Sequence, residues 1–272
     1  MRRTETFHTS GPLSLDLRLP SGQIELEAVD GEETTVELEA TRDSDDIREV
    51  IENARIELHQ RGDGHELLVD VQRKRFKLGF DFMRGEIVLR VRAPHGADVD
   101  VSTASAYVDG RGNFGALRAQ VASGDLRFME LGGRVDIKSA SGDVDLGRVV
   151  GEASINTASG DVRVDRIEGD ATIRSASGDV EVEEAASSVT VQSASGDQRL
   201  GAVSSGRVVM QSASGDQTVG IRRGSRVHID AKTMSGDTSS ELVVGEEPPP
   251  GDGPTVELRA TSMSGDIRIL RA

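Results

Sequence analysis

The tripeptide Ser-Gly-Asp recurs down the C-terminal two-thirds of this 272-residue chain at a nearly constant interval. The copies begin at Ser123, Ser141, Ser159, Ser177, Ser195, Ser214, Ser235 and Ser264, so the intervals are 18 residues at first and then 19, 21 and 29. A fixed period of this length indicates structural units that stack, each contacting mainly its neighbours. The repeat therefore predicts a solenoid of stacked coils.

Apolar residues recur at set positions when each repeat is numbered from its glycine. Positions 3, 5, 8, 12 and 14 are apolar, as in Val144, Leu146, Val149, Ala153 and Ile155. Positions 3 and 5, and positions 12 and 14, flank a polar residue, which indicates two short strands per repeat, each with one buried face. Position 17 is an alanine, which we add to the apolar columns: Ala140, Ala158, Ala176 and Ala194.

These columns predict an all-β fold, a single-stranded parallel β-solenoid with about 18 residues per coil, right-handed by preference. Stacked strands lie about 4.8 Å apart, so the apolar columns become continuous ladders inside a tube. Ser-Gly-Asp forms a corner of each coil. Glycine adopts positive φ without steric cost, and each Asp is expected to accept backbone N–H bonds at its own corner.

Residues 1–100 are expected to form a β-rich N-terminal portion that caps or begins the solenoid of residues 101–272. The run Ser21–Leu26 repeats the corner and first strand, and Val36–Ala40 repeats the second strand. Strand-like runs also follow at Arg55–His59, Glu66–Gln72 and Glu86–Arg92.

One short helix is predicted near residues 44–55. Ser44 is a suitable N-cap, and Ile47, Val50 and Ile51 share one helical face.

A basic and aromatic segment at residues 73–84 interrupts this pattern. Its candidate partner-binding residues are Arg73, Lys74, Arg75, Phe76, Lys77, Phe80 and Phe82. They suit a loop that binds a protein or, as a peripheral contact, an anionic headgroup. The alternative is a hairpin whose Phe side chains cover the open end of the core.

The C-terminal coils carry a Pro-rich loop insertion at residues 245–254, interpreted as a solvated spacer. Arg268–Ala272 then forms the last coil. We expect it to be the uncovered end of the solenoid, through which copies associate.

The corner aspartates form one column, which is the only candidate for metal binding. Its members Asp125, Asp143, Asp161, Asp179 and Asp197 could hold cations between successive carboxylates. Calcium-binding solenoids, however, repeat a glycine-rich nonapeptide, and here the period is 18. The chain has no Cys, and its five His residues lie in no catalytic or zinc-ligand pattern. We therefore predict no enzyme, no cofactor, and no metal site beyond this weak candidate.

The charge distribution narrows the partners. The chain carries 32 basic and 47 acidic side chains, a net charge of −15, which disfavours nucleic acid. No apolar run reaches the length of a transmembrane span, and the N-terminus lacks the apolar core of a signal peptide. A cytoplasmic protein is expected, with an envelope-associated one as the alternative.

The repeated Ser-Ala-Ser-Gly-Asp-Val-x-Val, preceded by Leu89–Val101, resembles the bacterial β-strand-repeat family named "putative adhesin", a domain of unknown function. The resemblance implies a parallel β-helix and, for some members, a link to envelope stress. It carries over no catalytic or cofactor residue. Together these observations favour a non-enzymatic scaffold or interaction protein, self-associating through the solenoid ends. The alternatives are a cell-surface adhesin or carbohydrate-binding β-helix and, less favoured, a polysaccharide-cleaving enzyme.

Overall fold

The computed structural model describes the chain apart from residues 43, 72–86 and 243–252. The basic and aromatic residues 73–84 and most of the loop at 245–254 lie outside the described residues. Strands make up 71% of the described residues and helix 3%, so the predicted all-β class is confirmed. The strands form two long, mostly parallel sheets, A and B. The chain divides into two compact units, Met1–Gly142 and Asp143–Ala272, and the division expected at residue 100 stays a prediction.

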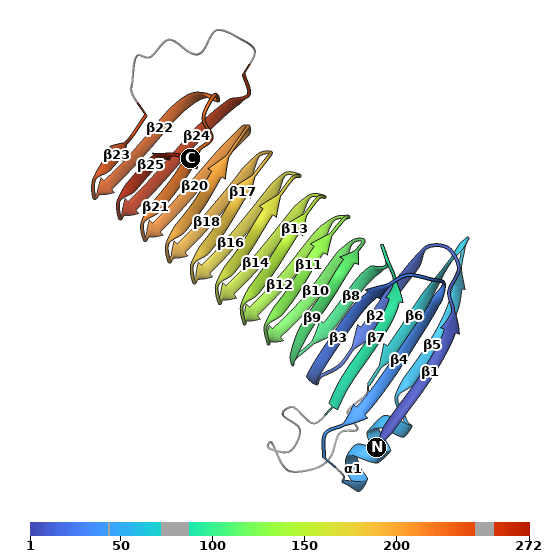
Figure 1. Ribbon diagram of the computed structural model, residues 1–272. Coiled ribbons are helices and arrows are strands. Elements are labelled where there is room, and N and C mark those ends of the chain that lie inside the picture. Colours follow the sequence, from blue (N-terminus) through green and yellow to red (C-terminus); the bar gives the residue numbers. More distant parts are fainter. Residues whose placement is uncertain (43, 72–86, 243–252) are drawn as a thin grey trace. The chain divides into compact units, whose positions relative to one another are not determined.

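In the unit of residues 143–272, strands alternate between the two sheets (Figure 1). Sheet A contains β13 (Val144–Val149), β15 (Val162–Ile167), β17 (Val180–Ala185), β19 (Gln198–Val203), β21 (Gln217–Ile221), β23 (Thr238–Ser240) and β25 (Ile267–Arg271). Sheet B contains β14 (Ala153–Ser159), β16 (Ala171–Ser177), β18 (Val189–Ser195), β20 (Gly206–Ser214), β22 (Arg226–Ser235) and β24 (Thr255–Ser264). Val144 pairs with Val162, and Ile155 with Ile173, so the predicted 18-residue coil is confirmed.

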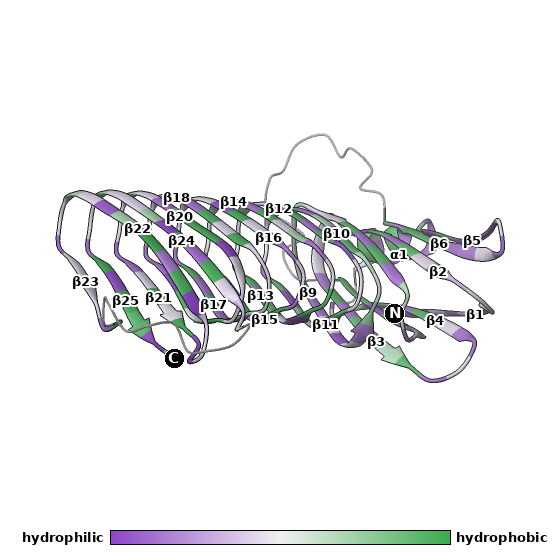
Figure 2. Ribbon diagram, turned by 90° about the horizontal axis from the view of Figure 1, so that it is seen from above, coloured by the Kyte–Doolittle hydropathy of each residue, from purple (hydrophilic) through white to green (hydrophobic). Residues whose placement is uncertain are grey.

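The apolar columns lie inside, as predicted. Val162, Val164, Ile167 and Ile173 are each at most 1% exposed, and apolar and polar residues alternate along the strands (Figure 2). Identical β-branched residues stack directly, because parallel pairing in register brings each residue beside its copy in the next coil.

The alanine at position 17 is an exception to this prediction. Ala158, Ala176 and Ala194 are exposed, and the preceding residue faces inward instead, as buried Ser175 does. Strand alternation continues up to the corner, so positions 12, 14 and 16 face the core and position 17 faces solvent.

The order of the last two coils also differs from the prediction. Strand order in sheet B is β20-β24-β22, and in sheet A it is β21-β25-β23. The coil that is last in sequence, β24 and β25, therefore lies between its two predecessors. Arg268–Ala272 is not the end of the stack. Instead β22 and β23, which we call the end coil, lie at the edges of the two sheets.

In the unit of residues 1–142, sheet A contains β1 (Arg2–His8), β3 (Ser21–Val29), β4 (Glu33–Ala40), β7 (Ile87–Pro94), β9 (Ser105–Phe114) and β11 (Leu126–Leu131). Sheet B contains β2 (Leu13–Arg18), β5 (Arg55–Arg61), β6 (Gly64–Asp70), β8 (Asp98–Thr103), β10 (Leu117–Ser123) and β12 (Val135–Ser141).

The expected coil at Ser21–Leu26 is confirmed, because β3 pairs in parallel with β9 and Ser21 lies opposite Ser105. The expectation for Val36–Ala40 is wrong. This run lies within β4, which pairs antiparallel with β7 and β1 and so belongs to the antiparallel part of sheet A rather than to a parallel coil.

The predicted helix is present as α1 (Asp45–Glu52). The Ser44 hydroxyl accepts the backbone N–H of Ile47 at 3.3 Å, as an N-cap residue should. Ile47 and Ile51 are 1% and 0% exposed, and Val50 on the same face is half-buried, so the helix packs against this unit through its apolar face. No helix among the described residues is both long and apolar enough to cross a membrane.

Candidate functional site

The corner aspartates form a hydrogen-bonded ladder in the unit of residues 143–272. Oδ1 of Asp143 accepts the backbone N–H of Asp161 at 2.9 Å. In the same way, the backbone N–H of Asp179 donates to Oδ1 of Asp161 at 2.9 Å, and the backbone N–H of Asp197 donates to Oδ1 of Asp179 at 2.8 Å. The acceptor role is as expected, but the donor lies in the next coil and not in the same corner. Parallel stacking places the amide of each corner over the carboxylate below it, so the ladder ties coil to coil.

This ladder accounts for one oxygen of each carboxylate. The pKa of Asp266 is lowered from its ordinary value, chiefly because its carboxylate accepts the backbone N–H of Asp237, with a further contribution from Arg268. Across the described residues, no group of three or more His, Asp or Glu side chains is arranged to hold a metal ion. Cation binding by Asp125, Asp143, Asp161, Asp179 and Asp197 stays a prediction.

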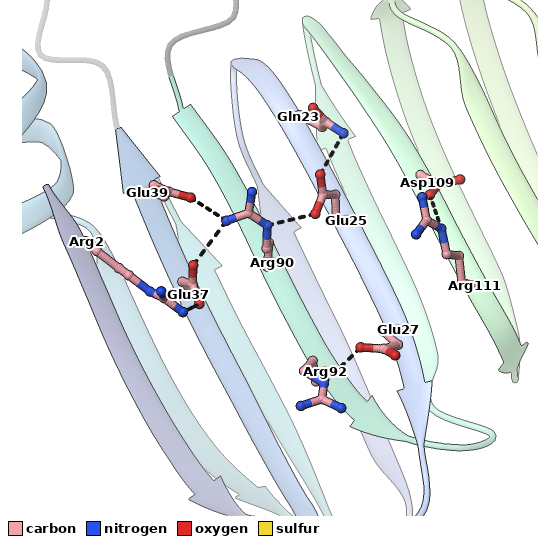
Figure 3. Close-up of polar contacts among 10 residues, drawn as sticks. All are labelled: Arg2, Gln23, Glu25, Glu27, Glu37, Glu39, Arg90, Arg92, Asp109 and Arg111. Carbon is pink, nitrogen blue, oxygen red and sulfur yellow. Dashed lines mark hydrogen bonds and ion pairs between the residues drawn. The ribbon is translucent and has the colours of Figure 1, made fainter. Parts of the chain in front are cut away.

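An ion-pair cluster lies on the outer surface of sheet A in the unit of residues 1–142 (Figure 3). Arg90 of β7 donates to Glu25 of β3 at 2.8 Å, and to Glu37 and Glu39 of β4. Arg2 of β1 reaches the same Glu37. The pKa of Arg90 is raised above its already high ordinary value, and that of Glu39 is lowered, chiefly because the two groups share a hydrogen bond. The opposite charges compensate one another across four strands, so this cluster has a structural role.

A groove of about 920 Å³ runs across the ends of β2, β8, β10 and β12 in the same unit. Its cationic side chains are Arg18 and Lys138, and most of the other lining residues are small or apolar. Arg18 donates to Asp16 at 3.0 and 2.6 Å. The strands that carry the two cations are three strand spacings apart in sheet B, about 14 Å.

Part of the outer surface of sheet B in the unit of residues 143–272 is different, because it is almost uncharged. We define the neutral face as the outward side chains of β14, β16 and β18, together with those of β20 that follow Arg207. These are Ser154, Asn156, Ala158, Thr172, Arg174, Ala176, Thr190, Gln192, Ala194, Val209, Gln211 and Ala213.

Hydrogen bonds hold one row of the neutral face in place. Arg174 Nε donates to Gln192 Oε1 at 3.0 Å, and Gln192 Nε2 donates to Gln211 Oε1 at 2.8 Å. Beside this row lies the row of exposed alanines. Arg174 is the one charged side chain in the set just defined, and the face ends at Arg207 of β20, which pairs with Glu257 of β24 at 3.1 Å. The result is a flat surface of methyl, hydroxyl and amide groups.

The outer surface of sheet A in the same unit is charged. Glu181 lies between Arg163, at 3.9 Å, and Arg199, at 3.2 Å. Arg166 bonds Glu184 at 2.7 Å, and Arg148 and Arg166 both reach Glu168. The pKa of Glu168 is lowered, chiefly by the hydrogen bond from Arg148. In this chain of net charge −15, the neutral face of sheet B therefore differs sharply in character from the outer surface of sheet A in the same unit.

None of the partner-binding residues predicted from the sequence falls in the described part of the chain: Arg73, Lys74, Arg75, Phe76, Lys77, Phe80 and Phe82. Their role stays a prediction. Sequence reasoning missed the neutral face because it searched where the period breaks. The signal was present in positions 13, 15 and 17 of successive repeats, which are mostly neutral.

The family model described as Toastrack DUF4097 matches residues 15–270. No curated protein matches significantly. A solved structure from Bacteroides fragilis named a "putative adhesin" is 12% identical, covers 100% of this chain and 97% of that one, and has a TM-score of 0.49. A "putative lipid binding protein" from Parabacteroides distasonis is 12% identical over 99% and 96% of the two chains, with a TM-score of 0.45.

Proposed function

The chain belongs to the Toastrack DUF4097 family, and we propose that it is a non-enzymatic β-helical scaffold that binds a partner protein through its neutral face. The observation that carries this proposal is the contrast between the outer surface of sheet A and the neutral face of sheet B in residues 143–272. The first is covered with ion pairs, and the second presents a single Arg among neutral groups.

Physical chemistry favours the neutral face as a protein contact. The centres of protein interfaces are depleted of charged residues, because burying an ion without a matched partner costs several kcal/mol. Alanine and threonine lose little side-chain freedom on binding, and the amide row is already ordered by its own hydrogen bonds. A partner would therefore meet a surface whose groups stand at fixed strand spacing of about 4.8 Å.

The polar groups of the unit support a scaffold over a catalyst. Its corner carboxylates accept amides from the next coil, and the charged residues on sheet A pair with one another. An interaction role uses this rigidity directly, since a stacked array of coils holds a binding surface in one shape.

Site-specific photo-crosslinking in the native host tests the proposal. A photoreactive residue would replace Thr190, on the neutral face, or Thr218, its counterpart on the outer surface of sheet A. We expect a discrete protein adduct from position 190 and none from position 218. Equal adducts from both positions, or no protein adduct from position 190, would refute the neutral face as the binding surface.

A further inference from the structure

The end coil exposes a strand edge and part of its apolar interior. Within the described residues, β22 pairs only with β24, and β23 only with β25. The inward-facing Ile229 is 41% exposed, whereas Leu258, its neighbour on β24, is 2% exposed. Val227, also inward-facing, is half-buried. Among the residues that the structure describes, the stack of coils therefore stops at a coil whose core residues have a neighbour on one side only.

The direction of the backbone groups on β22 can be derived from one hydrogen bond. The N–H of Arg226 donates to the carbonyl of Pro254, at the start of β24, at 2.9 Å. Backbone groups of an extended strand point alternately to its two edges. Those of Val227, Ile229 and Ala231 therefore point away from β24, towards the open edge. Such a row of N–H and C=O groups is a template for another strand.

The unit of residues 1–142 ends differently. Its edge strand β1 is joined to α1, because Arg3 Nη1 donates to the carbonyls of Ile51 and Ala54 at 3.0 and 2.8 Å. The helix buries Ile47 and Ile51 beneath it. This end has a helical cap over apolar residues, so the exposed core at the end coil is the stronger candidate for self-association.

We propose that the end coil binds the end coil of a second copy of this chain, with β22 pairing antiparallel to β22 about a two-fold axis at Ile229. Two copies of one edge strand related by a two-fold axis are necessarily antiparallel, and the contact closes after two copies. This register places Ile229 opposite Ile229 of the second copy and Val227 opposite Ala231. The apolar residues that the end coil leaves exposed then cover each other.

Charge complementarity selects a second copy as the occupant. The outward side chains of β22 include His228, Asp230 and Lys232. About the axis at Ile229, His228 faces Asp230 of the second copy on both sides of the dyad. Lys232 is neutralised within its own strand by Asp230, at 3.0 Å. An axis one residue further on would oppose Asp230 to itself, which like-charge repulsion disfavours. The contact uses the sheet edges and leaves the neutral face accessible, so it is independent of the proposed partner.

Cysteine cross-linking tests the register, because the native chain contains no Cys. Directly opposed residues in a hydrogen-bonded antiparallel pair have Cα atoms about 5.5 Å apart, within disulfide range. Under mild oxidation, Ile229→Cys in the full chain should give a covalent dimer in high yield. Asp230→Cys, one residue away from the axis, and Thr4→Cys on edge strand β1 should give no covalent dimer. Ala231→Cys as the one efficient cross-linker would overturn the proposed axis, and equal cross-linking at Thr4 and Ile229 would overturn the end-coil contact.

A backbone variant tests the strand pairing without relying on a cysteine. Ala231→Pro removes an N–H that points to the open edge, so it leaves the bonds of β22 to β24 in place. Sedimentation over a concentration series should show a monomer–dimer equilibrium for the native chain and for Ala231→Ser, and a monomer for Ala231→Pro. A native chain that stays monomeric throughout, or an Ala231→Pro chain that dimerises equally well, would refute the proposal.

Discussion

Replacing Gly178 by alanine tests whether the corner glycines are required by the stacking of coils. Gly178 has a φ of +118°, and a Cβ there would lie 2.3 Å from the carbonyl oxygen of Gly160 in the preceding coil. Ordinary van der Waals contact begins at about 3.5 Å, so the two corners would have to separate by roughly 1 Å. The Cβ is attached directly to the backbone and the atom that it meets is a backbone oxygen, so no side chain can rotate away to relieve the clash.

Gly31 is the matched control for this substitution. Its φ is also +118°, but a Cβ there would meet nothing within 4 Å. Alanine at either position carries backbone strain of about 1–3 kcal/mol. At Gly178 the separation also stretches inter-corner bonds such as the one from Asp179 N–H to Asp161 Oδ1, 2.9 Å long, which adds about 1–3 kcal/mol. We therefore expect Gly178→Ala to lower the free energy of unfolding by about 2–6 kcal/mol and Gly31→Ala by about 1–3 kcal/mol.

The two glycines lie in different compact units, so the assay must report on each unit separately. Hydrogen exchange in increasing urea, read by mass spectrometry, gives the opening free energy of peptides around each site. If Gly178→Ala destabilises its unit no more than Gly31→Ala destabilises the other, then positive φ alone explains the glycines. The argument from stacked corners would then be wrong.

Further substitutions test the ladder, the core and the charges, each read by urea unfolding. Asp179→Ala should lower the free energy of unfolding by about 1–2 kcal/mol, because the Asp179 carboxylate accepts the backbone N–H of the next corner. Asp179→Asn keeps an acceptor oxygen and should lower the free energy of unfolding by less than half of that amount. The pKa of Asp266 is lowered, so the stabilisation that its carboxylate provides is present above pH 3.8 and is lost as the pH falls through the lowered pKa. The difference in free energy of unfolding between the native chain and Asp266→Asn should therefore disappear in acid. Ile173→Ala should cost about 2–5 kcal/mol and Ala176→Ser less than about 0.5 kcal/mol, because the first is buried and the second exposed. Arg90→Met should lower the free energy of unfolding less at high salt than at low salt. The substitution leaves three glutamates facing one another, and salt screens the repulsion between them.

The parallel coils could be predicted from the sequence because one residue pattern repeats with the period of the structure. The columns containing Val162 and Ile173 show both the alternation of a strand and the recurrence of a stack. The antiparallel strand β4 could not be distinguished in the same way. Val36 and Leu38 alternate with glutamates as they would in a parallel coil, and the direction of pairing leaves no trace in that alternation.

The neutral face was harder to predict because it depends on which residues share a surface. Position 17 was assigned to the core from its small apolar side chain, yet Ala176 is exposed. The exposure of Ala176 follows only from the alternation of inward and outward residues along the strand, in which Ser175 faces inward. A buried hydroxyl beside an exposed methyl runs against the usual expectation. Once the parity is known, the rows containing Asn156 and Gln192 can be read directly from the repeats.

The inserted coil shows how burial overrides sequence order. Consecutive elements usually lie side by side, so β22 and β23 would be expected to stack directly on β20 and β21. Their inward residues in sheet A, Thr238 and Ser240, are polar, whereas β25 supplies Ile267 and Ile269, at 0% and 1% exposed.

Placing the more apolar coil inside buries two isoleucines, worth about 3–6 kcal/mol together. The longer connection that this requires adds only about 0.6 kcal/mol of loop-closure entropy per doubling of length. The observed order is also held by a buried side chain, because Gln217 Nε2 donates to the carbonyl of Thr261 on β24 at 3.1 Å. The coil left at the end is therefore the one whose interior tolerates water best, except at Ile229, and this exception is what a second copy would cover.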